Sequence, residues 1–474
     1  GGSEMVKITG SPHPREDNED RHAREVASMY GLTPKVEAAI RYTIQNEQWN
    51  RLRMLIDPLH PADKADFLER ISSEDLRIIV RQLGSDFDAE ILPYLHEEVR
   101  ENVRGLLDPD VFAASLPELD SDDVVTIAEE LAPEQLNEAL AALPAQERVL
   151  VEQNLAYPED SAGRMMQREM VVVPPFWTVG QTIDFLRSSE LDRDEFYLIM
   201  VTDASGHPVG EVRLSKLLCT QRPRRIAEIM DTEIRSIPAT MDQEEVALLF
   251  RRYGMITTGV IDEEGRLVGI ITLDDIIDVI DEEAEEDLMA LAGVSDASIR
   301  TSVLETFQGR APWLFVNLIT AVIASVVIGF FESTIEKVVA LAVLMPIVAS
   351  MGGNAGTQTV TVAVRAIAMR EFSPKVAVTF GLRELYVGIA NGLIFAVVTA
   401  GLSYVWFGDA QIALVLGIAM LVNMVVAAIS GTLIPLSLVK VGVDPAIASS
   451  VFITTITDVI GFLVFLGLAA LYLL

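Results

Sequence analysis

The sequence predicts a multidomain membrane protein with four structured parts: an all-α superhelical N domain, a tandem pair of α/β modules, a connecting helix and a five-helix transmembrane domain. Its 474 residues are too many for one hydrophobic core. The net charge of −33 arises entirely from residues 1–307, because residues 308–474 carry seven basic and seven acidic side chains. That neutral part contains five apolar runs, each long enough to cross a hydrocarbon core about 30 Å thick.

The composition also bounds the partners of the chain. An excess of acid repels nucleic acid and anionic lipid and attracts cations, although surface carboxylates that only provide solubility would give the same composition. The single cysteine, Cys219, cannot form an intrachain disulfide, which fits a reducing cytoplasm around the acidic part. We predict a disordered tail over 1–33, the N domain over 34–161, the modules over 162–281, the connecting helix over 282–307 and the transmembrane domain over 308–474.

Helical periodicity runs through the N domain. Apolar residues recur at spacings of three and four over 67–71, 76–80 and 124–128. Helix-start signals such as Ser72 and Asp120 precede these runs. Their spacing of about 12–15 residues predicts short antiparallel helices stacked as a small superhelix. This part contains no recognisable catalytic motif, so we interpret it as an interaction surface.

A tandem repeat follows the N domain. Asp203 and Asp262 occupy equivalent positions 59 residues apart, and so do Gly210 and Gly269. Each copy alternates short β-like runs with a helix, which predicts a pair of β-α-β modules. The pattern, clearest in the run Val-Gly-Ile-Ile-Thr-Leu-Asp-Asp at 268–275, resembles paired cystathionine-β-synthase-type (CBS) domains. The resemblance implies a sensor that often holds an adenine nucleotide such as ATP, with Thr272 and Asp275 where that family contacts a ribose. A pair that holds no nucleotide is an equal alternative.

The second module leads into a strongly acidic run. Nine of the fourteen residues from 274 to 287 are acidic, and Lys and Arg are absent from 267 to 299. In a helix, Asp275, Asp278, Glu282 and Glu286 share one face, where like charges repel. Bound Mg²⁺ would relieve that repulsion, because it keeps much of its water and needs only one or two carboxylates. A solvated acidic helix is the alternative.

The five apolar runs are residues 311–331, 338–364, about 385–407, 410–439 and 445–474. Basic residues collect in the loop that we place after the second span, namely Arg365, Arg370, Lys375 and Arg383. By the positive-inside rule this loop is cytosolic, as is the acidic part of the chain. Five crossings then leave the C-terminus outside the cell.

The second span contains residues that a lipid-facing helix does not need. Between 344 and 359 stand Pro346, three glycines, Asn354, Gln358 and threonines, without any charge. We expect an interrupted helix whose freed backbone groups and amides line a wet pore or binding site. A tightly packed helix crossing that uses small residues is the alternative.

Asp458 is the one ionisable residue that we place well inside a span, next to the hydroxyls of Thr454, Thr455 and Thr457. A carboxylate at membrane depth is functional by default, and a structural acid paired with a base is the alternative. No His or Cys follows residue 219, so the available ligands suit hard cations. One carboxylate with neutral oxygens favours a hydrated Mg²⁺ over Ca²⁺, which takes more direct oxygen ligands.

The run Gly-Gly-Asn-Ala-Gly-Thr-Gln-Thr at 352–359, together with Thr-Thr-Ile-Thr-Asp at 454–458, resembles the MgtE family of magnesium channels and transporters. The membrane part alone is also similar to solute carrier family 41. The order of the N domain, CBS pair, acidic helix and five spans matches the family over about residues 34–474. The resemblance implies a homodimeric, Mg²⁺-selective channel of the plasma (inner) membrane that takes up magnesium and is closed by cytosolic Mg²⁺.

The family's functional positions carry over to this sequence as follows. The ion path would be lined by Asp458, Gly353, Asn354, Thr357, Thr361 and Thr454. The regulatory Mg²⁺ ligands would be Asp242, Glu244, Asp275, Asp278, Glu283, Glu286, Asp287 and Asp444, with an N-domain partner among Asp120, Asp122 and Asp123. Many members carry Asn where this chain has Thr357, and some carry an acid where it has Gly254.

Two other functions compete with the channel. A secondary transporter could exchange a divalent cation for H⁺ or Na⁺, with Asp458 as the protonatable carrier. A membrane-tethered nucleotide sensor without transport would leave Asp458 unexplained. The sequence contains neither a nucleophile–base pair nor a phosphate-binding loop, so we do not expect an enzyme.

Overall fold

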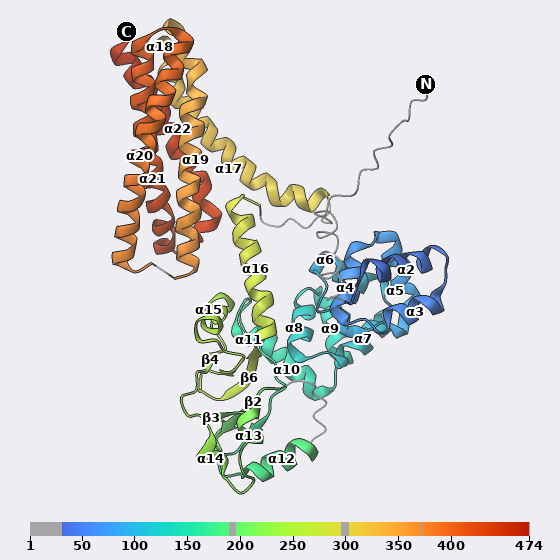
Figure 1. Cartoon of the computed structure of the whole chain (residues 1–474). Coiled ribbons are helices and arrows are strands. Elements are labelled where there is room, and N and C mark those ends of the chain that lie inside the picture. Colours follow the sequence, from blue (N-terminus) through green and yellow to red (C-terminus); the bar gives the residue numbers. More distant parts are fainter. Residues whose placement is uncertain (1–30, 189–195, 295–302, 371, 474) are drawn as a thin grey trace, which may run out of the picture. The chain divides into compact units, whose positions relative to one another are not determined.

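The computed structural model describes residues 31–188, 196–294, 303–370 and 372–473, so most of the predicted tail over 1–33 lies outside the described residues (Figure 1). The chain divides into two compact units, residues 1–279 and 280–474. The first unit contains the N domain and the tandem modules. The second contains the rest of the acidic helix and the apolar helices.

The N domain is all-helical, as predicted. Its helices are α2 (Pro34–Gln45), α3 (Trp49–Ile56), α4 (Pro61–Arg70), α5 (Ser73–Leu83), α6 (Glu97–Leu106), α7 (Pro109–Ser115), α8 (Ser121–Glu129), α9 (Pro133–Ala142) and α10 (Ala145–Leu155), with the 3-10 turns η1 (Gly84–Asp86), η2 (Ala89–Ile91) and η3 (Leu116–Glu118). Local caps start several of them: the Ser72 hydroxyl accepts from the Asp75 amide, and Thr33 caps α2. Phe67, Ile79 and Leu92 lie in one continuous apolar core.

The two modules repeat one topology, which confirms the tandem repeat. The first contains α11 (Ala162–Met165), β1 (Val172–Val173), α12 (Val179–Ser188), β2 (Leu198–Thr202), β3 (Pro208–Arg213) and α13 (Leu214–Leu218). The second contains α14 (Ile226–Ile229), β4 (Ile237–Pro238), α15 (Gln243–Tyr253), β5 (Thr257–Ile261) and β6 (Leu267–Thr272). In each sheet the first two strands are parallel and the last two antiparallel.

Three glycines with a left-handed backbone close turns or end a helix. Gly265 closes the β5–β6 turn at φ +79°, and Gly206 closes the equivalent turn of the first module at φ +86°. Gly254, at φ +61°, ends α15. Some family members carry an acid at this position, but here Gly254 provides the left-handed backbone that ends α15.

The acidic run is helical, as predicted, but the connecting helix has other limits than 282–307. Helix α16 spans Leu273–Leu291, so it begins directly after β6. Gly293, at φ +70°, follows its end, and the next described helix is α17 from Val303. The predicted start at 282 misses the first turns of α16, and residues 295–302 of the predicted connecting helix lie outside the described residues. Ile276 and Val279 anchor the first turns of α16 in the second module's core.

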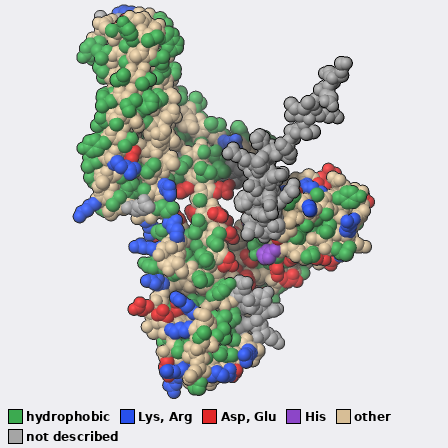
Figure 2. Space-filling view, viewed as in Figure 1, with side chains coloured by type: hydrophobic (Ala, Val, Ile, Leu, Met, Phe, Trp, Pro, Cys, Tyr) green, Lys and Arg blue, Asp and Glu red, His purple; other side chains and the backbone are tan. Residues whose placement is uncertain are grey.

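The second unit contains α17 (Val303–Gly329), α18 (Glu332–Lys337), α19 (Ala340–Ala368), α20 (Pro374–Phe407), α21 (Ala410–Val441) and α22 (Pro445–Tyr472) (Figure 1). Five of these are long and apolar enough to cross a membrane, which confirms the predicted number of spans. Helix α21 is the most buried and packs against α19, α20 and α22. Figure 2 shows a mostly hydrophobic surface over this bundle, as a lipid-facing exterior requires.

Two predictions about these spans were wrong. Helix α19 is continuous from Ala340 to Ala368, although we expected an interruption near Pro346. One proline removes a single backbone donor, and tight packing through glycine keeps the remaining helix in place. The third span begins at Pro374 rather than near 385, so Arg383 and Glu384 lie inside a helix instead of a loop. The predicted span started after these two charged residues because it was based on hydropathy alone. Asp458 is therefore not the only ionisable residue within the candidate spans.

Candidate functional site

One face of α19 carries polar residues that a single chain leaves open. Asn354, Thr357 and Thr361 are exposed and follow one another at helical spacings of three and four. The hydroxyl of Thr357 donates to the Gly353 carbonyl (3.0 Å), and that of Thr361 donates to the Thr357 carbonyl (3.0 Å). No described atom lies within 4 Å of the position that a Cβ would take at Gly353. Lipid does not suit such a face, so water, ions or a second chain must cover it.

Asp458 and Thr454 form a second polar face, on α22. Thr454 is exposed, and Asp458 is half-buried one turn later. Among the described residues, no basic side chain pairs with Asp458. The hydroxyls of Thr455 and Thr457 bond to carbonyls of their own helix, and Thr457 is fully buried, so Thr457 does not join this face.

The two faces adjoin because α19 and α22 pack closely. A Cβ at Gly356 would overlap the Cγ2 methyl of Ile453, so the helices touch at this pair. Thr357 follows Gly356 in the chain, and Thr454 follows Ile453. The packing therefore brings the predicted path residues of both helices to one side of a single helix contact. Gly356 serves this contact, which is the small-residue packing that the sequence left as an alternative.

Asn423 is a central residue that sequence reasoning missed. It is fully buried in α21, and its Nδ2 donates to the Val348 carbonyl of α19 (2.8 Å). A Cβ at Gly352 would overlap this amide, and a Cβ at Gly461 would come within 2.9 Å of it. These glycines make room for the Asn423 side chain between α19 and α22. Gly461 lies three residues after Asp458 in α22. A lone amide in an otherwise apolar span was the signal that could have identified it.

Glu384 is a second residue that was missed. Its carboxylate is buried, accepts from the Thr359 hydroxyl of α19 (3.2 Å) and pairs with Arg383 (3.0 Å). Thr359 lies on the opposite side of α19 from Thr357 and Thr361. Glu384 therefore binds α19 on the side opposite to its polar face. Arg383 of the same helix pairs with Glu384, whereas no described base pairs with Asp458.

The predicted regulatory acids form two small groups. In the first unit, the carboxyl groups of Asp122 of α8 and Asp275 of α16 lie close enough to influence each other's pKa. Burial, together with the charge of Asp275, raises the pKa of Asp122 well above its usual value. Burial raises the pKa of Asp123 to about 7 and that of Asp275 to about 6. Asp122 and Asp123 are thus the N-domain acids that lie near Asp275 of α16, and Asp122 is the more deeply buried of the two.

This pair fits a hard cation. The Oδ1 atom of Asp122 is buried and has no hydrogen-bond partner in the described part of the chain. A cation would satisfy it and would offset the burial that raises the pKa values of both carboxyl groups. Within the described ranges, no group of three or more Asp, Glu, His or Cys side chains could hold a metal. Mg²⁺ that keeps most of its waters needs no more than this pair.

A second pair lies within the second unit. Burial and then the charge of Asp444 raise the pKa of Asp287, with a further contribution from Glu286. Asp444 caps the start of α22, where its Oδ1 accepts from the Ala446 amide (2.7 Å). Ala290, one turn after Asp287, is buried with Val360 of α19 and Ile453 of α22. The acidic end of α16 therefore packs against α19 and α22, the two helices that carry the polar faces.

The remaining predicted acids have other positions. Asp242 caps α15 by accepting from the Glu244 amide (3.0 Å). Asp278 is exposed on α16 and Glu283 is half-buried, while Asp120 accepts from the Gln167 amide (3.5 Å) and its charge raises the pKa of Asp122. At the predicted nucleotide contact, the hydroxyl of Thr272 donates to Asp275 (2.7 Å), so these two residues already satisfy each other in part.

Comparisons with known proteins agree with this organisation. The family model MgtE, described as a divalent cation transporter, matches residues 345–468; the MgtE intracellular N domain matches 59–160, and the CBS domain matches 226–282. The magnesium transporter MgtE of Bacillus subtilis is 32% identical over 89% of this chain and 94% of its own length. That of Thermus thermophilus is 31% identical over 93% of this chain and 99% of its own.

Solved structures resemble the soluble part. A crystal structure of the soluble part of a magnesium transporter has 28% identity and a TM-score of 0.48, and covers 53% of this chain and 98% of that chain. The cytosolic domain of the Mg²⁺ channel MgtE in complex with ATP has 31% identity and a TM-score of 0.48, and covers 51% of this chain and 99% of that chain.

Proposed function

We propose that this chain, which belongs to the MgtE family of magnesium transporters, is a Mg²⁺-selective channel that takes up magnesium and that cytosolic Mg²⁺ closes. The observation that carries the proposal is the unpaired Asp458 beside the polar faces of α19 and α22. One carboxylate, Asn354 and threonine oxygens can hold a Mg²⁺ ion through its water shell. They offer too few direct ligands for Ca²⁺.

A homodimer would complete the path. Polar residues that a membrane helix leaves exposed need a polar covering, and the same face of a second copy supplies one. Two copies of Asp458 would then face one divalent ion and balance its charge. We place the protein in the plasma (inner) membrane, with the N-terminus in the cytosol and the C-terminus outside.

Gating would follow from the acidic pairs. At high cytosolic Mg²⁺, ions bind Asp122 with Asp275 and Asp287 with Asp444, and hold α16 in the closed arrangement. At low Mg²⁺, the ionised pairs repel, and the arrangement loosens so that the path opens. A ligand shifts such an equilibrium only by its difference in affinity between the two states, and two carboxylates held together supply that difference.

Ion flux into proteoliposomes separates a channel from a coupled transporter. We expect Mg²⁺ uptake, followed with an encapsulated Mg²⁺-sensitive dye, to be driven by membrane potential alone and to proceed without H⁺ or Na⁺ gradients. Uptake that stops when an opposing H⁺ or Na⁺ gradient is removed would instead establish the exchange mechanism, with Asp458 as the carrier. Vesicles that contain the Asp458→Asn variant serve as the control, and their Mg²⁺ uptake is subtracted as the background rate.

The raised pKa values predict how pH acts on the soluble part. Because Asp123 and Asp275 titrate near 7 and 6 when buried, the packed state binds protons more tightly than an opened state does. Its stability is therefore highest at low pH and falls as pH rises through 6 to 7. In EDTA, we expect the thermal unfolding midpoint of the full chain to be higher at pH 6 than at pH 8.

Protons and Mg²⁺ compete for the same carboxylates, so added Mg²⁺ should stabilise the chain more at pH 8 than at pH 6. The surroundings include Asp120 and Asp274, which raise these pKa values further, and Arg100, which lowers that of Asp123. The triple variant Asp122→Asn, Asp123→Asn and Asp275→Asn should lose most of both effects, because it removes every carboxyl group with a strongly raised pKa at this site. If it keeps the pH dependence of the native chain, these three acids are not its source.

An adenine nucleotide in the CBS pair stays a prediction. Thr272 and Asp275 stand where the CBS resemblance places the ribose contact, but Asp275 also meets Asp122. A nucleotide and a cation would therefore share this carboxylate.

A further inference from the structure

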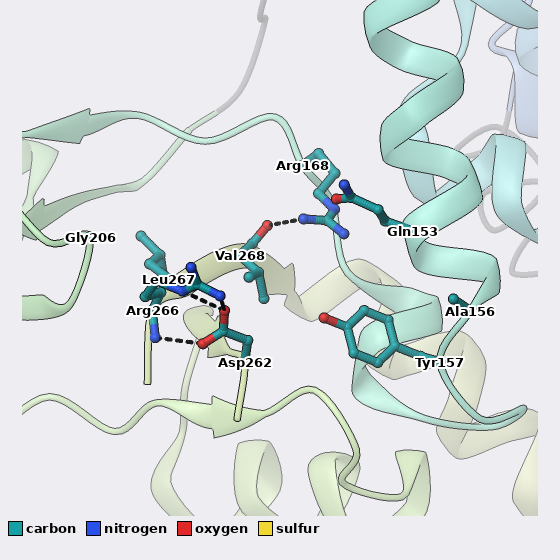
Figure 3. A pocket seen from close by; sticks show the side chains of 9 residues that line it. All are labelled: Gln153, Ala156, Tyr157, Arg168, Gly206, Asp262, Arg266, Leu267 and Val268. Atoms are coloured by element: carbon teal, nitrogen blue, oxygen red, sulfur yellow. Dashed lines mark hydrogen bonds and ion pairs between the residues drawn. The ribbon is translucent and has the colours of Figure 1, made fainter. Parts of the chain in front are cut away.

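A pocket of about 540 Å³ lies in the first unit, and neither Asp122 nor Asp275 lines it (Figure 3). Helix α10 and the residues after it contribute Gln153 and Tyr157, and the segment that leads into the first module contributes Arg168. The β5–β6 turn contributes Asp262 and Arg266, and Gly206 comes from the equivalent turn of the first module. An occupant would therefore touch the N domain and both modules at once.

Arg168 is a half-buried cation whose protein partners are all neutral. Its Nε donates to Oδ1 of Asn154 (2.6 Å), and its Nη1 donates to the Val268 carbonyl (2.9 Å). No described carboxylate lies within ion-pair distance of Arg168; the neighbouring Glu169, which accepts from the Ser121 hydroxyl (2.7 Å), acts on it only through its charge. Burial lowers the pKa of Arg168, which shows that the protein solvates this charge poorly.

The other groups of the pocket leave this charge uncompensated. Asp262 is the one carboxylate in the lining, and Arg266 already pairs with it (2.7 Å). The Tyr157 hydroxyl makes no hydrogen bond to the described residues, and Figure 3 shows it pointing from its chain segment into the pocket, between Arg168 and Asp262. The lining thus carries a net positive charge in a half of the chain that is otherwise strongly acidic.

We propose that this pocket binds a small organic phosphate, with the phosphate group at Arg168 and the Tyr157 hydroxyl. Guanidinium and hydroxyl donors match phosphate oxygens, and charge-assisted hydrogen bonds of this kind are the strong ones. The aliphatic surfaces of Ala156, Leu267 and Val268 leave room for a carbon skeleton, and the volume falls in the range of small-molecule sites.

The same segment joins this pocket to the Asp122–Asp275 pair. The Arg168 amide donates to the Ser121 hydroxyl (2.9 Å), and Ser121 directly precedes Asp122 at the start of α8. A phosphate that holds Arg168 against α10 and β6 would therefore favour the packing that brings Asp122 to Asp275. This coupling rests on the proposed gating, and it would act in both directions: the phosphate tightens Mg²⁺ binding, and Mg²⁺ tightens phosphate binding.

Calorimetric titration of the full chain in detergent and EDTA tests the site. The probes are inorganic phosphate, ribose 5-phosphate and AMP, each up to about 10 mM. We expect ribose 5-phosphate or AMP to bind more tightly than inorganic phosphate. Arg168→Gln should weaken binding at least about tenfold, and Tyr157→Phe, which removes only a hydroxyl, should weaken it less. Arg187→Gln on exposed α12 removes the same charge elsewhere and should leave binding unchanged.

Absence of binding by all three probes would overturn the proposal. So would equal affinities in the native chain, Arg168→Gln and Tyr157→Phe. Tighter binding of inorganic phosphate than of both organic probes would reject the organic ligand. Thr272→Ala separates the predicted nucleotide contact from this pocket: AMP binding that Thr272→Ala abolishes and Arg168→Gln spares would also overturn it. Binding that depends on Arg168 but leaves Mg²⁺ affinity unchanged would refute the coupling, whereas failure of Mg²⁺ gating itself would leave the phosphate site standing.

Discussion

Replacing Asp458 with asparagine is expected to lower Mg²⁺ uptake about a hundredfold without disturbing the fold. The carboxylate is half-buried in α22, and no described base neutralises it. A charge held near a divalent cation in such a site contributes about 3 kcal/mol or more, which corresponds to about a hundredfold in occupancy. Asparagine keeps the shape and an oxygen, so the expected loss measures the charge. Dye-loaded proteoliposomes give the uptake rate.

The matched control is Asp409→Asn. Asp409 caps the start of α21, where asparagine caps equally well, and it lies at a span end rather than beside the polar faces. This variant should transport like the native chain. If Asp458→Asn transports as fast as Asp409→Asn, with equal amounts of folded protein in the vesicles, Asp458 is not the central ligand of the path.

Neutralising Glu283, Glu286 and Asp287 together is expected to leave the path open at cytosolic Mg²⁺ concentrations that close the native chain. Asp287 and Glu286 lie at the Asp444 site, and the end of α16 packs with α19 and α22. Without these charges, Mg²⁺ can no longer favour one position of the helix over the other. We expect the concentration for half-closure to rise at least about tenfold, the equivalent of one lost interaction of about 1.4 kcal/mol.

Currents from excised patches, with the cytosolic face perfused, measure this shift. A variant with Glu134, Glu138 and Glu147 neutralised removes three charges from exposed positions of the N domain and should close like the native chain. Closure of the α16 variant at native Mg²⁺ concentrations would contradict the role of its acids. A smaller current at low Mg²⁺ would point to damage of the path instead.

Local signals explain what the sequence could predict. The N-domain helices follow from caps such as Ser72 and from apolar spacing, and the tandem modules follow from the 59-residue repeat. The comparisons confirm the family that the motifs at 352–359 and 454–458 indicated. Each of these features is encoded within a short stretch, so no tertiary contact is needed to recognise it.

Contacts between residues far apart in the chain explain what the sequence could not predict. Asp122 stands out from Asp120 and Asp123 only because folding buries it most deeply, with both Asp122 and Asp123 near Asp275. Glu384 fell just outside the predicted third span, because hydropathy does not show that Thr359, 25 residues earlier in the chain, donates a hydrogen bond to it. The glycines of the α19 motif predicted a break in the helix. Instead Gly352 admits the side chain of Asn423 and Gly356 admits that of Ile453. The roles of the path and sensor residues stay predictions until they are measured.

Single-channel recording of the purified chain in planar bilayers, with cytosolic Mg²⁺ varied, tests the central claim most directly. The account predicts unitary Mg²⁺ currents whose open probability falls as cytosolic Mg²⁺ rises, while the unitary conductance through the Asp458 path stays constant. Flux that never resolves into unitary currents, or currents whose open probability is independent of cytosolic Mg²⁺, would contradict it.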